Sequence, residues 1–332
     1  MERLKVGIVG LGNWGLCHLE AYRDLPFVEV VAVCDIRLER RQIASERYGV
    51  PYTFEDAESM MKLPEIGLVS VVTFERDHLR PALLALSAGK NVLVEKPVAT
   101  KVEEARAMRE AARKSGKFIV PGHLLRFEPK YAEIRRMIAA GELGAVASIY
   151  LKRSRERSLF QTYRRTHTVH ELMVHDLDQA IWYAGGRVKR VYASGRFAQD
   201  ADSPEVLWAQ LTFDNGVIAV LHANWMTPDE AGIAINDCTE VIGEKGTACF
   251  DTNAAGVQLL GTGGRRTTDL SVHHNQNGRI IGALKEQLAY VSLCALNGTT
   301  PDILSFDDAI HGLEVAEAIV QSARGGRVVD LS

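Results

Sequence analysis

The sequence lacks the features of membrane, secreted or nucleic-acid-binding proteins. None of its apolar runs reaches the length of about 20 residues that a membrane-spanning helix needs, and no basic and apolar leader precedes the first predicted strand. The net charge is −3, so no excess of positive charge indicates a nucleic acid or an anionic membrane as partner. We therefore expect a cytoplasmic protein that binds neither.

Cysteine is scarce and scattered. The chain has five cysteines, an odd number, and no Cys-x-x-Cys spacing, which argues against both a disulfide framework and a zinc site. Their apolar neighbours predict buried thiols at Cys17, Cys34, Cys238, Cys249 and Cys294.

The composition is that of an ordinary globular protein, with 46% hydrophobic and 24% charged residues. The 332 residues suffice for two domains, each with its own core. No internal repeat or low-complexity tract interrupts the chain.

Residues 1–121 alternate short apolar runs with helical patterns, which predicts a parallel sheet with helices on both faces. We expect this part to be a Rossmann dinucleotide-binding domain. The predicted strands are Leu4–Val9, Val28–Cys34, Leu68–Val72, Asn91–Val94 and Phe118–Val120. The predicted helices cover residues 14–24, 38–48, 77–88 and 102–115.

Residues 122–332 follow a different pattern, because several strands succeed one another without helices between them. This indicates a second α/β domain with an open, mostly antiparallel mixed sheet. Asp214-Asn215-Gly216 predicts a hairpin turn. The expected strands are 146–155, 188–197, 205–213, 217–226, 239–242, 247–250 and 257–260, and the expected helices are 129–140, 168–183, 278–296 and 307–323.

The strongest cofactor signal is the Gly-x-Gly-x-x-Gly pattern from Gly10 to Gly15, which directly follows the first predicted strand and opens a helix. In such a fingerprint the glycines permit a tight turn and a close approach to pyrophosphate, which binds at the helix N-terminus. Asp35 ends the next strand, where a carboxylate would accept hydrogen bonds from ribose hydroxyls. The pattern therefore predicts a dinucleotide site.

The acid at position 35 favours NAD, because a carboxylate repels a 2′-phosphate. NADP remains an alternative, since Arg37, Arg40 and Arg41 follow and could bind that phosphate, although they also fit the solvated face of a helix.

Glu95-Lys96-Pro97 ends the predicted strand Asn91–Val94. Proline restricts its own φ and the conformation of the preceding residue, so Lys96 leaves the strand in a limited direction. Ligands of open α/β sheets bind at the carboxyl ends of the strands, which makes Lys96 a candidate for the site.

Together with the fingerprint, several motifs resemble those of the Gfo/Idh/MocA oxidoreductases, the family of glucose-fructose oxidoreductase and inositol 2-dehydrogenase. They are residues 88–97, Gly122-His123 with Arg126-Phe127 and Pro129, residues 141–144, and Val174-His175-Asp176-Leu177-Asp178. The resemblance covers nearly the whole chain. It implies an NAD(P)-dependent dehydrogenase that acts on a sugar, polyol or sugar-acid-like substrate. It also implies that the protein forms a homodimer or homotetramer through the C-terminal sheet. The apolar residues of that sheet need to be covered, and they are Trp208, Leu211, Phe213, Val220 and Trp225.

The resemblance also implies catalytic roles for Lys96 and His175. His175 would take the hydroxyl proton, since an imidazole titrates near neutral pH, and Lys96 would donate a hydrogen bond to the reacting oxygen. Relatives commonly have aspartate four residues before the histidine, where this chain has Glu171. On an α-helix, Glu171 and His175 would lie about 40° apart on one face.

The remaining candidates form two groups. Cofactor contacts are expected from Gly10, Gly12, Asn13, Trp14, Gly15, Asp35, Ile36, Arg37, Thr73, His78, Glu95, Lys96 and Pro97. Substrate contacts are candidates at His123, Arg126, Arg155 and His167. Arg126 fits an interdomain ion pair equally well, and His167 fits a surface position at a helix end.

Several alternatives stay open at this stage. Relatives often have Thr-Pro-Asn where this chain has Thr73-Phe74-Glu75, so that loop departs from the family pattern. The arginines between 153 and 165 fit a solvated strand and loop, or recognition of an anionic sugar. No metal is expected, because His170 and His175 are one residue too far apart for the zincin pattern. An NAD-dependent glycosidase and a non-catalytic dinucleotide sensor are the rival functions.

Overall fold

The computed structural model describes residues 3–233, 235–252, 257–261, 264–268 and 270–332. The chain forms two compact units: residues 1–127 with 271–310, and residues 128–270 with 311–332. The single division expected after residue 121 therefore differs from the observed one, because residues 271–310 return to the N-terminal unit and the second division falls within helix α10 (Phe306–Gly325).

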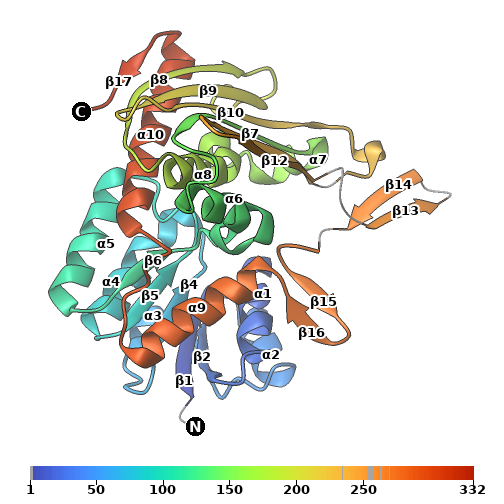
Figure 1. Ribbon diagram of the computed structural model, residues 1–332. Helices are drawn as coiled ribbons and strands as arrows, with labels where there is room; N and C mark the ends of the chain where they lie inside the picture. The colour runs from blue at the N-terminus through green and yellow to red at the C-terminus, as the bar shows by residue number, and fades with distance from the viewer. Residues whose placement is uncertain (1–2, 234, 253–256, 262–263, 269) are drawn as a thin grey trace. The chain divides into compact units, whose positions relative to one another are not determined.

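The first unit contains a six-stranded parallel sheet in the order β3-β2-β1-β4-β5-β6 (Figure 1). Its central strands have continuous apolar sequences, as is typical of a parallel sheet buried on both faces. The chain order reverses between β1 and β4, and the carboxyl ends at such a switch point form the usual ligand site. The strands are β1 (Leu4–Val9), β2 (Val28–Cys34), β3 (Tyr52–Phe54), β4 (Leu68–Val71), β5 (Asn91–Val94) and β6 (Ile119–Pro121).

Helices pack on this sheet in two groups. Helix α4 contacts both α3 and α5, and α1 packs with α9, whose Leu284, Leu288 and Val291 join the core around β1. This packing explains why the C-terminal segment belongs to the first unit. The elements are α1 (Asn13–Arg23), α2 (Leu38–Glu46), α3 (Ala57–Met61), η1 (Glu75–Asp77), α4 (Leu79–Ser87), α5 (Val102–Ser115), η2 (Leu124–Phe127), β15 (His274–Gln276), β16 (Arg279–Ile281) and α9 (Ala283–Asn297).

The second unit contains a seven-stranded sheet in the order β12-β11-β7-β10-β9-β8-β17, in which only β7 and β10 are parallel among the described pairs. The predicted hairpin joins β9 to β10, and Gly216 provides the positive φ of its turn, +88°. The strands are β7 (Val146–Glu156), β8 (Val188–Arg196), β9 (Val206–Phe213), β10 (Ile218–Thr227), β11 (Asn236–Gly243), β12 (Thr247–Asp251) and β17 (Val329–Asp330), with a separate pair β13 (Val257–Gly261) and β14 (Gly264–Thr268).

Helix α8 packs on β7 and β10, and α6 packs on α8 and β12, so these helices cover one face of the mixed sheet (Figure 1). Trp225, Leu211 and Phe213 are buried, whereas Trp208 and Ile218 are exposed. The helices of this unit are α6 (Pro129–Ala139), α7 (Arg157–Tyr163), a π-helix η3 (Val169–Met173), α8 (Val174–Ala184) and a short turn η4 (Asp229–Ala231). Helix α7 occupies part of the arginine-rich segment for which the sequence predicted a strand and loop.

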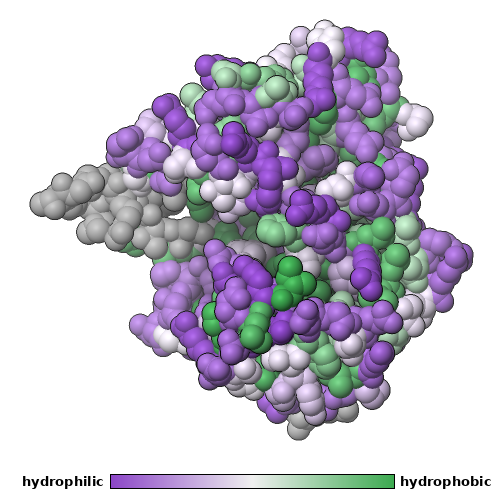
Figure 2. Space-filling model, turned by 180° about the vertical axis from the view of Figure 1, so that it is seen from behind, coloured by the Kyte–Doolittle hydropathy of each residue, from purple (hydrophilic) through white to green (hydrophobic). Residues whose placement is uncertain are grey.

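Hydrophilic residues predominate on the face shown in Figure 2, where apolar residues gather in small groups. None of the described helices combines the length and apolar character needed to cross a membrane. All five cysteines are free thiols, but the prediction that all are buried is wrong: Cys249 is exposed, and Cys17 and Cys238 are half-buried.

Candidate functional site

Three glycines shape the loop between β1 and α1. Gly10 has a φ of +94°, and a Cβ there would lie 2.5 Å from the Val72 carbonyl oxygen. A Cβ on Gly15 would lie 2.0 Å from the oxygen of Gly10, so neither position accepts a side chain. Gly12 differs, because a Cβ there would meet no atom within 4 Å. The open space beside Gly12, next to the free N–H groups at the start of α1, fits a dinucleotide pyrophosphate.

Asp35 links the end of β2 to this loop. Its buried carboxylate accepts hydrogen bonds from the backbone N–H of Leu11 at 2.7 Å and from that of Arg37 at 2.9 Å. A carboxylate offers about four acceptor positions, so these bonds leave capacity for ribose hydroxyls. The ribose role of Asp35 stays a prediction, with an added structural role that the sequence did not indicate.

The arginines after Asp35 are engaged with the same turn. Arg41 donates to the backbone oxygen of Asp35 at 2.7 Å, and the Arg37 guanidinium contacts the Asp35 carboxylate at 3.3 Å. Ile36, which lies between Asp35 and Arg37 in the chain, is 82% exposed. Arg41 thereby supports the turn, and Arg37 adds positive charge beside the carboxylate.

The loop after β4 contains Thr73 and the 3₁₀-helix η1, so the predicted helix from residue 77 begins later, at Leu79. His78 is the N-cap residue of α4 and is buried. Its ring nitrogens lie 3.0 Å from the Pro97 carbonyl oxygen and 3.2 Å from that of Thr73. Burial lowers the pKa of His78. His78 thus connects the loops that follow β4 and β5.

Lys96 follows β5, at the same sheet edge as the glycine loop and Thr73, because β1, β4 and β5 are adjacent parallel strands. The peptide bond between Lys96 and Pro97 is cis. Glu95 is buried, and its carboxylate accepts the Lys96 backbone N–H at 3.0 Å and contacts His18 Nε2 at 3.0 Å. His18, which lies one helical turn beyond the fingerprint, was not among the residues predicted from the sequence.

Gly122 and the residues after it support the same loop. A Cβ on Gly122 would lie 2.8 Å from the carboxyl carbon of Glu95, so glycine is required there. His123 is buried. Arg126 is also buried and donates to the Ile303 carbonyl oxygen at 2.8 Å and to Asp308 at 2.9 Å. All three residues of this Arg126 cluster belong to the first unit.

Glu171 and His175 lie in the second unit at the junction of the π-helix η3 with α8. A π-helix has i→i+5 hydrogen bonds. The α-helical angles predicted for Glu171, His170 and His175 therefore do not apply across this junction. Glu171 also approaches Arg165, with 4.0 Å between their charged atoms. Among the residues that the structure describes, no group of three or more His, Cys, Asp or Glu is placed to hold a metal.

His167 supports the start of η3. Its Nδ1 accepts the backbone N–H of Val169 at 3.1 Å. Burial, with the nearby charges of His170 and Arg324, lowers the pKa of His167 to about 3. The ring is consequently neutral at physiological pH, as this hydrogen bond requires, and its substrate role stays a prediction.

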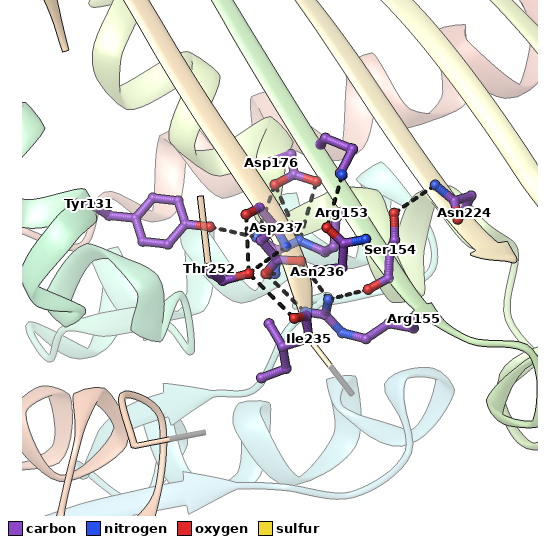
Figure 3. Close-up of polar contacts among 11 residues, drawn as sticks. Tyr131, Arg153, Ser154, Arg155, Asp176, Asn224, Ile235, Asn236, Asp237 and Thr252 are labelled. Carbon is purple, nitrogen blue, oxygen red and sulfur yellow. Dashed lines mark hydrogen bonds and ion pairs between the residues drawn. The ribbon is translucent and has the colours of Figure 1, made fainter. Parts of the chain in front are cut away.

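Arg153 and Arg155 lie on strand β7, as predicted, but their side chains belong to a network of charged residues rather than to a solvated surface (Figure 3). The Arg153 side chain is only 3% exposed and donates to Asp176 at 2.9 Å, to Asp237 at 2.8 Å and to the Tyr131 hydroxyl at 3.2 Å. Arg155 donates to the other oxygen of Asp237 at 2.5 Å. Asp176 is thus held by Arg153, and its neighbour in the chain is the catalytic candidate His175.

The two carboxylates of this network have different environments. Burial raises the pKa of Asp176 to about 6, although Arg153 opposes the shift. Burial acts in the same direction on Asp237, but Arg153 and Arg155 together hold the pKa of that carboxyl below its usual range. The Arg155 candidate for substrate binding therefore already has a carboxylate partner.

Comparisons with known proteins agree with this architecture. The family description "Oxidoreductase family, NAD-binding Rossmann fold" matches residues 4–123, and the description of the GFO/IDH/MocA C-terminal domain matches residues 131–249. The two matches together cover more than half of the chain.

The chain is 25% identical over 357 residues to D-apiose dehydrogenase of Paraburkholderia graminis, covering 100% of this chain and 90% of the relative. It is 26% identical over 341 residues to scyllo-inositol 2-dehydrogenase (NAD(+)) of Bacillus subtilis, covering 99% and 97%. A similar fold occurs in scyllo-inositol dehydrogenase from Lactobacillus casei with bound NAD(H) and scyllo-inositol, with a TM-score of 0.85, 21% identity and 99% coverage of each chain. The chain belongs to the Gfo/Idh/MocA family of oxidoreductases, and its first unit is an NAD-binding Rossmann domain.

Proposed function

We propose that this protein is an NAD-dependent dehydrogenase that oxidises a secondary alcohol of a sugar, polyol or sugar-acid-like substrate. One observation carries the proposal: the open space beside Gly12, the Asp35 carboxylate and the loop of Lys96 lie along the carboxyl edge of one parallel sheet. A dinucleotide bound along this edge would extend from the ribose acceptor towards a lysine.

Bound NAD would supply the hydride acceptor. Gly12 and the N-terminus of α1 would hold the pyrophosphate, and Asp35 the ribose. Lys96, as an ammonium ion, would donate a hydrogen bond to the oxygen of the reacting carbon. His175 would take the hydroxyl proton as that oxygen becomes a carbonyl, with Glu171 orienting or stabilising the imidazole.

The substrate is tested by a screen with NAD and with NADP, followed by the absorbance of the reduced cofactor. Scyllo-inositol, myo-inositol, D-apiose, aldoses, sugar acids and nucleotide sugars form the panel, because the similar dehydrogenases are named for inositol and apiose. We expect NADH formation with a polyol or an aldose. Release of sugar from a glycoside without net NADH would favour a glycosidase, and dinucleotide binding without turnover of any compound would favour a sensor.

Asp35→Ser is expected to shift the ratio of kcat/KM values from NAD towards NADP by about tenfold or more, since a carboxylate repels a 2′-phosphate that serine tolerates. The ratio is the informative quantity, because loss of the hydrogen bond between Leu11 and Asp35 would weaken the binding of NAD and NADP to a similar extent. Asp56→Ser is the matched control: Asp56 caps α3 through the Ser59 N–H, and serine is also a good cap. An Asp35→Ser ratio equal to that of Asp56→Ser would contradict the ribose role.

We also propose that the protein works in the cytoplasm as a homodimer or homotetramer. The mixed sheet supports the oligomer, because it exposes large side chains, namely Tyr192 on β8, Trp208 on β9 and Ile218 on β10. Leu211 and Phe213 on β9 are buried instead. Exposed aromatic side chains on a sheet face are typical of a surface that another chain covers. Light scattering of the purified protein measures the oligomeric state.

A further inference from the structure

The Glu95 carboxylate lies between helix α1 and the loop of Lys96, and it is 4% exposed. Each of its oxygens has a different partner: Oε1 contacts His18 Nε2 at 3.0 Å, and Oε2 accepts the backbone N–H of Lys96 at 3.0 Å. Burial opposes ionisation of Glu95, but the hydrogen bonds from His18 and Trp14 and the charge of Lys96 hold its pKa below the usual value.

His18 is completely buried, and its ring lies between two aromatic rings of the same helix. The ring centroids are 6.1 Å from Trp14 and 6.3 Å from Tyr22, both in edge-on geometry. Because a carboxylate only accepts hydrogen bonds, His18 Nε2 carries the proton towards Glu95. Its Nδ1 is buried without a hydrogen-bond partner, a cost that an apolar residue of similar size would avoid.

We propose that His18 is a positioning residue for Lys96, acting through the two oxygens of Glu95. The proposal rests on the proposed catalytic role of Lys96. His18 fixes one oxygen of the carboxylate, and the other oxygen fixes the backbone from which the Lys96 side chain extends. Helix α1, which begins at the dinucleotide fingerprint, is thus connected to the loop that carries the lysine.

Loss of the His18 hydrogen bond should release the carboxylate to turn, and Lys96 would move with it. A misplacement of about 1 Å can lower turnover about a hundredfold. We therefore expect His18→Leu to lower kcat by about 10- to 100-fold and to leave the Kd for NADH within about threefold. His18→Gln should restore most of the turnover, because the glutamine Nε2 can donate to Glu95 in place of the imidazole.

A double-mutant cycle separates positioning from general support of the fold. In a Lys96→Ala background, His18→Leu should lower kcat by less than about threefold, since the group that it positions is gone. Tyr22→Phe is the matched control: Tyr22 is buried on the same helix, and its hydroxyl lies 2.7 Å from the Ser70 hydroxyl. We expect Tyr22→Phe to keep the wild-type kcat in both backgrounds.

Hydrogen exchange of the cofactor-free protein provides a readout that needs no substrate. The Lys96 amide should exchange at least about tenfold faster in His18→Leu than in the wild type. Its exchange rate should be unchanged in Tyr22→Phe and in His18→Gln. If His18→Leu does not fold, as judged by circular dichroism, His18→Asn replaces it, because its shorter amide cannot span the same distance. The kinetic experiments use scyllo-inositol and D-apiose with NAD. If neither compound reacts, the hydrogen-exchange experiment alone tests the positioning role of His18.

The outcomes separate the two proposals. Full activity of Lys96→Ala alone would overturn the catalytic role of Lys96, and the positioning role with it. A severe loss in Lys96→Ala, combined with an equal effect of His18→Leu in both backgrounds, would overturn only the positioning role. Unchanged exchange of the Lys96 amide in His18→Leu would overturn it as well.

Discussion

Alanine at Lys96 or at His175 is expected to lower kcat at least about a hundredfold while dinucleotide binding persists. Loss of one donor to a developing oxyanion costs about 10²- to 10³-fold, and loss of a general base about 10²- to 10⁴-fold. Neither substitution touches the glycine loop or the Asp35 carboxylate, so the Kd for NADH should change by less than about threefold. Steady-state kinetics with the best substrate of the screen, and fluorescence titration with NADH, measure the two quantities.

Lys101→Ala is the control for a lost lysine in the same unit, because Lys101 is exposed just before α5. It should retain the wild-type kcat. Wild-type turnover in either Lys96→Ala or His175→Ala would rule out the corresponding catalytic role. A Kd for NADH that rises as strongly as kcat falls would instead assign the residue to cofactor binding.

The sequence predicted the parallel sheet well, because buried parallel strands are continuous apolar runs. β1, β2 and β5 have the predicted bounds, and so does α5, which has acidic residues in its first turn, basic residues in its last and Gly116 at its C-cap. β3 and α3 escaped prediction, since three and five residues are too few to show a period. Helix α9 belongs to the first unit because it packs against α1, and a local sequence pattern cannot predict such a long-range contact.

The candidate site likewise contains residues that local sequence predicts and residues that only the folded chain brings together. Fingerprint glycines and Asp35 were predictable because their spacing follows the local requirements of a turn and a strand end. The partners of Glu95 and Arg153 were not, because His18 is 77 residues from Glu95, and Asp237 is 84 residues from Arg153. The arginine run looked solvated in the sequence because opposite charges on β11 and α8 become neighbours only when the sheet and its helix assemble.

Arg153→Met is expected to destabilise the protein by about 3–5 kcal/mol at neutral pH, which is the usual cost of removing one partner of a buried ion pair. Methionine fills a similar volume, but the Asp176 and Asp237 carboxylates would then lie close together without the cation between them. Urea unfolding gives the free energy of unfolding. Arg190→Met is the control, because the pair of Arg190 with Asp330 on β17 is exposed, and its loss should cost no more than about 1 kcal/mol.

The pH dependence of this loss has a definite sign. Without Arg153, the raised pKa of Asp176 should rise further in the folded protein, and the pKa of Asp237 should rise from its lowered value. A carboxyl with a raised folded-state pKa contributes stability at low pH that is lost as the pH rises through that pKa. In the wild type the Asp176 pKa already lies at about 6. The deficit of Arg153→Met should therefore be smaller at about pH 5 than at about pH 8. A deficit that is equal at both pH values would mean that lost packing, rather than uncompensated charge, causes it, and Arg153 would then act mainly as a spacer between β7, α8 and β11.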